Sequence, residues 1–170
     1  MSTSPLHLPD AEAQCRALAE QIRPHLTPDT ALVGIYSGGA WIAERLTQLL
    51  PLPEEAGLID ISFYRDDFAE KGLHPQVRPT HIPFEVEGRK LILVDDVLYT
   101  GRTTRAALNE LFDYGRPAAV ELAVLADRGG RELPMAPTYC VWHLELPRQT
   151  CLTLKRDDAG RLSWSVEDHA

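Results

Sequence analysis

The chain has 170 residues, of which 44% are hydrophobic, and a formal net charge of −8. This length and apolar content suffice for one domain with a sizeable core. The acidic charge is spread along the chain and argues against wholesale electrostatic binding of nucleic acid, although a local basic face stays open. Three cysteines without metal-site spacing favour reduced thiols in a cytoplasmic protein, and no apolar run approaches the ~18 residues that a membrane span needs.

The first predicted elements are a helix and a buried strand. After a loose leader over residues 1–8, Asp10 is expected to cap a helix that runs to about Arg23. Ala13, Ala17 and Leu18 are predicted to face the core. The apolar run over residues 31–36 predicts a strand buried on both faces.

Ser37, Gly38 and Gly39 follow that strand and precede a helix predicted from about Ala40 to Leu50. A strand, a glycine-rich turn and a helix can form an anion site, because the first backbone N–H groups of a helix are free and the helix dipole favours negative charge. The alternative is a plain tight turn.

The next predicted strand covers residues 58–64 and ends in Arg65-Asp66-Asp67, a charged triplet that is equally well explained as a solvated strand end. Residues 66–81 are polar and contain Gly72, Pro75 and Pro79. A loop of this length in a compact domain is usually functional or disordered.

Residues 91–104 (LILVDDVLYTGRTT) are the most informative stretch of the chain. Leu91 to Val94 predict a buried strand, and Asp95 and Asp96 stand at its carboxyl end, where open α/β sheets bind ligands. Gly101 permits a tight turn before a helix expected from about Arg105 to Tyr114. The order suits a ligand with sugar hydroxyls or Mg²⁺ near the two acids and a phosphate in the turn.

Thr100, Thr103 and Thr104 add hydroxyl groups to that turn. A Walker A loop is excluded, because no Gly-Lys-Ser/Thr occurs at the required spacing. The remaining alternative is a strand–turn–helix corner that exposes two acids by chance.

The rest of the chain is predicted to complete the sheet. Residues 82–87 form a hairpin with the strand at 91–94, and residues 120–126 form a further strand. Residues 151–155 and 162–166 are predicted strands joined by a turn at 157–160. Trp142 is interpreted as a core tryptophan, with stacking on a ligand base as the alternative.

Residues 91–104 resemble the 5-phosphoribosyl-1-pyrophosphate (PRPP) signature of type I phosphoribosyltransferases. The resemblance implies a single domain over residues 1–170 with a three-layer α/β fold: a mainly parallel central sheet, a small hood and a flexible loop at about 66–81. It implies that Asp95 and Asp96 hold the ribose hydroxyls and Mg²⁺. It places the 5′-phosphate in the loop formed by Tyr99, Thr100, Gly101, Arg102, Thr103 and Thr104.

The same resemblance makes Ser37, Gly38 and Gly39 the pyrophosphate-binding corner, in which Gly38 stands where an arginine is expected. Arg65 and Arg131 are implied as further contacts to PRPP, with Arg131 near the pyrophosphate. The loop offers further cations to the phosphates: Lys71, His74, Arg78 and His81. Purine-salvage members carry an aspartate at the position of Tyr99, which argues against a purine substrate.

Four motifs in one order narrow the resemblance: residues 59–67, 94–103, 115–117 and 125–134. Together they resemble the bacterial pyrimidine-operon attenuation regulators that are also uracil phosphoribosyltransferases. The implied reaction joins uracil to PRPP and gives UMP and pyrophosphate. The implied partners are PRPP, uracil, UMP, the leader RNA of a pyrimidine operon, and a second copy of the chain in a homo-oligomer.

Three departures, that of Gly38 and two more, leave the function open between two classes. Gly130 replaces a usual histidine, and residues 139–150 differ in the segment that lies against the base. The first class is a uracil phosphoribosyltransferase, active or weakened. The second is a catalytically inactive, nucleotide-sensing regulator that binds RNA, for which five arginines offer a basic patch: Arg102, Arg105, Arg116, Arg128 and Arg148.

Overall fold

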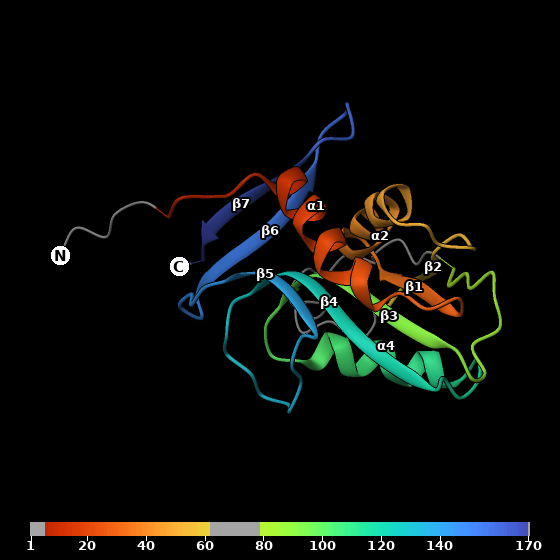
Figure 1. Ribbon diagram of the computed structural model, residues 1–170. Coiled ribbons are helices and arrows are strands. Elements are labelled where there is room, and N and C mark those ends of the chain that lie inside the picture. Colours follow the sequence, from red (N-terminus) through yellow and green to blue (C-terminus); the bar gives the residue numbers. More distant parts are fainter. Residues whose placement is uncertain (1–5, 62–78, 170) are drawn as a thin grey trace.

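The structure is a computed structural model that describes residues 6–61 and 79–169. None of the described helices is both long and apolar enough to cross a membrane. In chain order the elements are α1 (Ala11–Ile22), η1 (Arg23–His25), β1 (Thr30–Ile35), α2 (Gly38–Leu49), β2 (Gly57–Ile59), β3 (Lys90–Leu98), α4 (Arg102–Phe112), β4 (Ala119–Asp127), β5 (Tyr139–His143), β6 (Thr150–Arg156) and β7 (Leu162–Asp168) (Figure 1).

A five-stranded sheet with the order β2-β1-β3-β4-β5 forms the centre of the fold, and all its neighbouring strands are parallel. Alternate residues of β3 enter two separate cores. Ile92 and Val94 pack with α1 and α2, whereas Leu91 and Leu93 pack with α4 on the opposite face. The predicted three-layer α/β fold is therefore confirmed (Figure 1).

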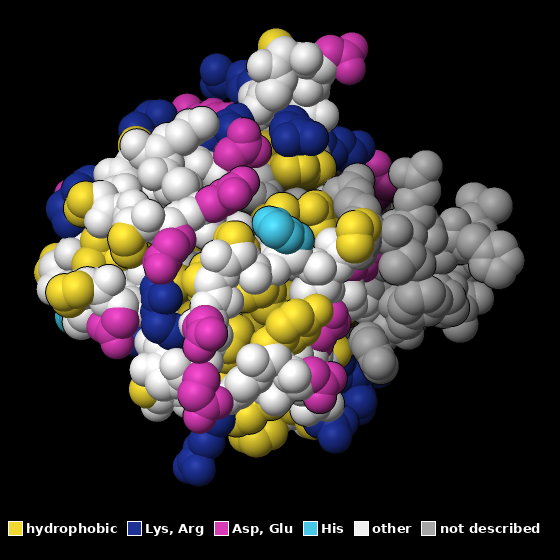
Figure 2. Space-filling model, turned by 90° about the vertical axis from the view of Figure 1, so that its right-hand side faces the viewer, with side chains coloured by type: hydrophobic (Ala, Val, Ile, Leu, Met, Phe, Trp, Pro, Cys, Tyr) yellow, Lys and Arg dark blue, Asp and Glu magenta, His cyan; other side chains and the backbone are white. Residues whose placement is uncertain are grey.

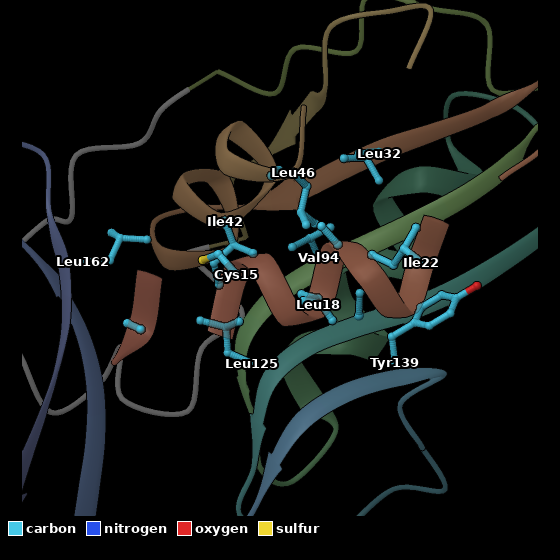
Figure 3. Packing of buried hydrophobic residues seen from close by; sticks show 14 of the residues in the cluster. Cys15, Leu18, Ile22, Leu32, Ile42, Leu46, Val94, Leu125, Tyr139 and Leu162 are labelled. Carbon is cyan, nitrogen blue, oxygen red and sulfur yellow. The ribbon is translucent and has the colours of Figure 1, made fainter. Parts of the chain in front are cut away.

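Helix α1 covers the sheet with a single apolar stripe. Its buried apolar residues include Ala11, Cys15, Leu18 and Ile22, which recur every three or four positions, as expected of one helix face. Figure 3 shows Cys15 beside Ile42 of α2 and Leu18 above the sheet. Asp10 caps α1 as predicted, since its side chain accepts from the backbone N–H of Glu12 (3.0 Å).

The prediction that Ala13 and Ala17 face the core is wrong, because both lie outside this stripe and are exposed. Helix α2 begins at Gly38 and α4 at Arg102, so each starts earlier than predicted.

Strands β6 and β7 form an antiparallel hairpin beside α1, at the predicted positions. The indole N–H of Trp164 donates to the side-chain oxygen of the buried Gln14 (2.6 Å). Trp142 meets Trp164 edge-on, with ring centroids 5.7 Å apart, and packs against the core on the α1 side of the sheet. The core interpretation of Trp142 is confirmed.

The outer edge of β5 is closed by one side chain. The amide of Gln21 donates to the backbone oxygen of Cys140 (3.0 Å) and accepts from its backbone N–H (3.2 Å). An α1 side chain thus takes the place of a neighbouring strand at this point.

Two strand predictions differ from the structure. Strand β2 ends at Ile59, and the part of the predicted strand after Ile61 lies outside the described residues. Residues 82–87 form no strand, so the predicted hairpin with β3 is wrong. Pro83 interrupts the alternating apolar pattern and has no N–H for a ladder, while Ile82 and Phe84 pack onto the core beside α4.

Glu12 links α1 to α2 and to the β6–β7 hairpin. Its carboxylate accepts from Arg45 (3.1 and 3.2 Å) and from the backbone N–H of Leu162 (2.9 Å). The hydrogen bond from Arg45 is the main reason that the pKa of Glu12 lies below its ordinary value. A carboxyl group with a lowered pKa stabilises the folded chain above its ordinary pKa, and this stability is lost as the pH falls through the lowered pKa.

We expect Glu12→Gln to reduce the free energy of unfolding at pH 7 by about 1–2 kcal/mol, because a charge-assisted bond is lost. The difference from the unmodified chain should shrink as the pH falls below about 4.3, the ordinary pKa of a glutamate. Chemical denaturation followed at several pH values measures this.

Glu20→Gln is the matched control, since Glu20 pairs with Arg23 on the same helix but is 69% exposed. A pair of that kind contributes about 0–1 kcal/mol. Equal losses for the two variants at pH 7 would contradict the role assigned to Glu12.

Candidate functional site

The candidate site lies where β1 and β3 end side by side. The helix after β1, α2, packs on one face of the sheet, and the helix after β3, α4, packs on the other. Such a divergence leaves a crevice at the carboxyl ends of the strands, which is where open α/β sheets bind ligands. The corner at residues 37–39 and the stretch at residues 95–104 meet at this place.

The two corners are in direct contact, and this contact depends on glycine. A Cβ on Gly38 would lie 2.3 Å from Oδ2 of Asp96, and a Cβ on Gly39 would lie 2.2 Å from the backbone oxygen of Val94. The Tyr36–Ser37 peptide bond is cis. The arginine expected at position 38 could not be placed here unless the carboxylate of Asp96 moved. The close approach gives a physical reason for the departure at Gly38.

Asp95 and Asp96 lie near the carboxyl end of β3 and inside the strand, because β3 extends to Leu98. Successive strand residues point to opposite faces, so Asp96 lies on the α2 side and Asp95 on the α4 side. Asp95 is 4% exposed, and its Oδ1 accepts from the backbone N–H of Asp96 (2.9 Å). Oδ1 of Asp96 accepts from the backbone N–H of Val97 (2.8 Å).

Asp96, whose carboxylate faces the corner at Gly38, suits a magnesium ion that arrives with a phosphorylated ligand. Among the described residues, no group of three or more histidines, cysteines or acids could hold a metal ion. Mg²⁺ is usually bound by one or two carboxylates together with substrate phosphates, so a cage made by the protein alone is not required.

The turn after β3 is held by hydrogen bonds from the chain that follows β4. Gly101 has a φ of 93° and precedes Arg102, the first residue of α4, whose backbone N–H donates to Oγ1 of Thr100 (3.2 Å), so the first N–H groups of the helix lie at this turn. The backbone oxygen of Thr100 accepts from the backbone N–H groups of Glu132 (2.9 Å) and Leu133 (3.0 Å). The turn that forms the candidate anion site is thus held in shape by the chain that follows β4.

Arg131 belongs to this chain segment. Its guanidinium donates to the backbone oxygens of Met135 (2.8 Å) and Tyr99 (2.9 Å) and to Oδ2 of Asp127 (2.6 Å). Burial raises the pKa of Asp127, but the hydrogen bonds from Arg131 and the backbone of Gly129 outweigh it, so the pKa lies below its ordinary value. The predicted contact of Arg131 with pyrophosphate stays a prediction, and its observed contacts are all structural.

The basic patch suggested by five arginines does not form as a unit. Arg128 is buried, and the backbone of Arg116 pairs with Gly88 and Glu87, near the start of β3. Arg102 and Arg148 both pair with Glu132 (2.9 and 2.8 Å), which offsets part of their charge. On the side of the molecule shown in Figure 2, acidic side chains form a band, and most basic side chains lie apart from one another toward the edge of the view.

Sequence reasoning missed the surroundings of Tyr99. The guanidinium carbon of Arg128 lies 4.1 Å from the centre of the Tyr99 ring. Gly130 has a φ of 77°, and a Cβ there would lie 2.4 Å from Cε2 of the same ring. The replacement of the usual histidine by Gly130 thus accompanies the packing of Tyr99. The feature of the sequence that could have indicated this packing is the position of Arg128, directly after a buried strand.

Several predicted contacts lie outside the described residues: Arg65, Lys71, His74 and Arg78. His81 is described and exposed, and its backbone pairs with that of Leu58 (2.8 and 2.9 Å).

Comparisons with known proteins agree with this geometry. The family model of the phosphoribosyl transferase domain matches residues 3–144. "Bifunctional protein PyrR" of Ralstonia nicotianae is 55% identical over 155 residues, which are 89% of this chain and 88% of the relative. "Bifunctional protein PyrR" of Pseudomonas aeruginosa is 50% identical over 147 residues, which are 84% of this chain and 86% of the relative.

Solved structures support the same fold. A hypoxanthine-guanine phosphoribosyltransferase of Bacillus anthracis superposes with a TM-score of 0.65 at 16% identity, over 85% of this chain and 86% of that one. A purine phosphoribosyltransferase of Pyrococcus horikoshii gives a TM-score of 0.60 at 29% identity, over 79% and 82%.

The broad and the narrow resemblance predicted from the motifs are both confirmed. The family model, the relatives and the fold agree, so the chain belongs to the phosphoribosyltransferase family and, within it, to the PyrR group.

Proposed function

We propose that the chain transfers the phosphoribosyl group of PRPP to uracil, giving UMP and pyrophosphate, and that the same site senses nucleotide in the control of pyrimidine genes. The observation that carries the proposal is the meeting of two corners at the ends of β1 and β3. One corner supplies an acid pair and an anion site, and the other supplies a second helix start.

Each part of the site takes one part of PRPP in this proposal. Asp95 and Asp96 orient the ribose hydroxyls. The N–H groups and hydroxyls of residues 100–104 bind the 5′-phosphate, and residues 37–39 bind the pyrophosphate. Mg²⁺ bound with PRPP would offset the charge of the pyrophosphate as it departs.

The residues act mainly by position and charge. Holding uracil and PRPP in line removes much of the entropy cost of their encounter. As the C1–O bond opens, positive charge develops on the ribose, and two carboxylates beside the ring stabilise that charge. No covalent nucleophile is required.

The regulatory part of the proposal includes leader RNA as a partner, a homo-oligomer of two or more copies, and a cytoplasmic location. The bifunctional naming of the relatives supports it. For RNA contact the structure offers Arg102 and Arg148, both on the surface near the anion site. Because Glu132 pairs with both, these two arginines offer RNA phosphates less net positive charge than two unpaired arginines would.

A nucleotide sensor without useful turnover is the second candidate. Its supporting observation is the contact between Gly38 and Asp96, which accommodates no cationic side chain at position 38 unless the Asp96 carboxylate moves. A charge-assisted contact to pyrophosphate is worth about 1.5–3 kcal/mol, so its absence would slow catalysis more than it would weaken UMP binding.

An assay with uracil, PRPP and Mg²⁺, beside calorimetry with UMP, separates the two candidates. Formation of UMP supports the transferase. Tight binding of UMP without turnover supports the sensor. Failure to bind either PRPP or UMP would refute both.

The acid pair can be tested by charge removal. We expect Asp95→Asn with Asp96→Asn to weaken PRPP binding in the presence of Mg²⁺ by about 100-fold or more, equivalent to about 2.7 kcal/mol, because both carboxylates contact the ribose and its metal. Asp157→Asn with Asp158→Asn, in the exposed turn of the β6–β7 hairpin, is the control. Unchanged PRPP affinity in the first variant would remove the acid pair from the site.

Gly38→Ala tests the contact between the two corners. The added methyl group would force the Asp96 carboxylate to move, and we expect PRPP affinity to fall about tenfold, or about 1.4 kcal/mol. Gly57→Ala is the matched control, since a Cβ there meets its neighbours at 3.4–3.5 Å, an ordinary contact. Equal PRPP affinity in both variants, measured by calorimetry, would show that Asp96 does not need its observed position.

A further inference from the structure

We propose that Arg128 is a positioning residue for the nucleobase: it holds the ring of Tyr99 and the chain at residues 147–150 as one wall of the site. The inference rests on the proposed function and identifies the base side of that site.

Arg128 follows β4 directly and is 6% exposed. Its guanidinium donates to the backbone oxygens of Thr150 (2.7 Å) and Pro147 (2.9 Å). No carboxylate of the described chain forms an ion pair with it, and within that part its buried Nε has no hydrogen-bond partner. Burying a cation without a counter-ion is costly, and a neutral side chain would serve stability better. The arrangement therefore points to a role beyond folding.

That role lies at Tyr99. The guanidinium carbon is 4.1 Å from the ring centre, a distance at which the positive charge is attracted to the ring face. The backbone of Gly130 lies against the same ring, so Tyr99 is confined by both residues. Tyr99 immediately precedes the anion site at residues 100–104. Arg128 thus joins the start of that site to the chain that leads into β6.

The geometry of the reaction places the base on this side. In a displacement at C1, the entering and leaving groups occupy opposite faces of the ribose. The leaving pyrophosphate lies toward the corner at residues 37–39, on the β1 side of β3. The base must therefore approach from the β4 side, where the sheet order places Tyr99, Arg128 and residues 147–150.

Only arginine satisfies these contacts together. A planar guanidinium can donate to two carbonyl oxygens and still present its face to an aromatic ring. A lysine ammonium at the same depth cannot make all three contacts. Arg128→Lys therefore keeps the charge and removes the geometry.

The first test compares Arg128→Lys with Arg89→Lys. Arg89 is a matched control, because its guanidinium also lies over a ring (Phe84, 5.3 Å) and donates to a backbone oxygen (Asp29, 2.8 Å), away from the candidate site. We expect Arg128→Lys to raise the KM for uracil and the Kd for UMP about tenfold, with the Kd for PRPP changed less than about twofold. Arg89→Lys should leave all three unchanged.

The second test asks whether Arg128 acts through Tyr99. Tyr99→Leu should weaken UMP binding to a similar extent, and adding Arg128→Lys to it should cost little more, because the ring that Arg128 positions is then absent. Additive losses in the double variant would mean that the two residues act independently and would overturn the proposal. Tyr99→Phe keeps the ring and should bind UMP like the unmodified chain.

Thermal unfolding of each variant shows whether a loss of binding comes from loss of the fold. If Arg128→Lys does not fold, Tyr99→Leu decides alone, and unchanged UMP affinity in it overturns the proposal. An unmodified chain that binds no PRPP would refute the proposed function instead. Intact PRPP and UMP binding in Arg128→Lys would refute only the role of Arg128.

Discussion

The close approach of the β1–α2 corner to the end of β3 is the constraint on which the site depends. Gly38 and Gly39 bring the backbone against Asp96 and Val94 at distances that no side chain permits. The parallel pairing of β1 with β3 fixes how the two corners meet, and the two cores hold that pairing from both faces. An acid pair and two helix starts therefore meet at the carboxyl ends of β1 and β3.

Much of this arrangement follows from local sequence, and the remainder from contacts between distant segments. Four consecutive branched residues predicted β3. The acid pair with its threonine-rich turn predicted an anion site, which stays a prediction. Residues 82–87 alternate like a strand, but Pro83 and packing against α4 decided otherwise. The contact of Gly38 with Asp96 depends on strand pairing across more than fifty residues, which no local pattern encodes.

The chain after β4 supports the turn after β3, which its amino-acid composition does not indicate. Residues 127–135 contain two arginines and two acids, which suggest a solvated surface loop. In the structure, Arg131 binds two backbone oxygens and Asp127, and Arg128 is buried. Arginine is suited to this work because one side chain can tie several carbonyl groups together. The flexibility expected of a glycine-rich loop is thereby restricted on the side that faces the crevice.

Gln21 has a consequence for how copies of the chain can associate. An open strand edge is a template for another strand, and β5 is the last strand of the sheet on its side. Because the Gln21 amide occupies both hydrogen-bonding groups of Cys140, a second chain cannot extend the sheet there without displacing the Gln21 side chain. Copies of the chain are therefore discouraged from associating by sheet extension at Cys140 of β5.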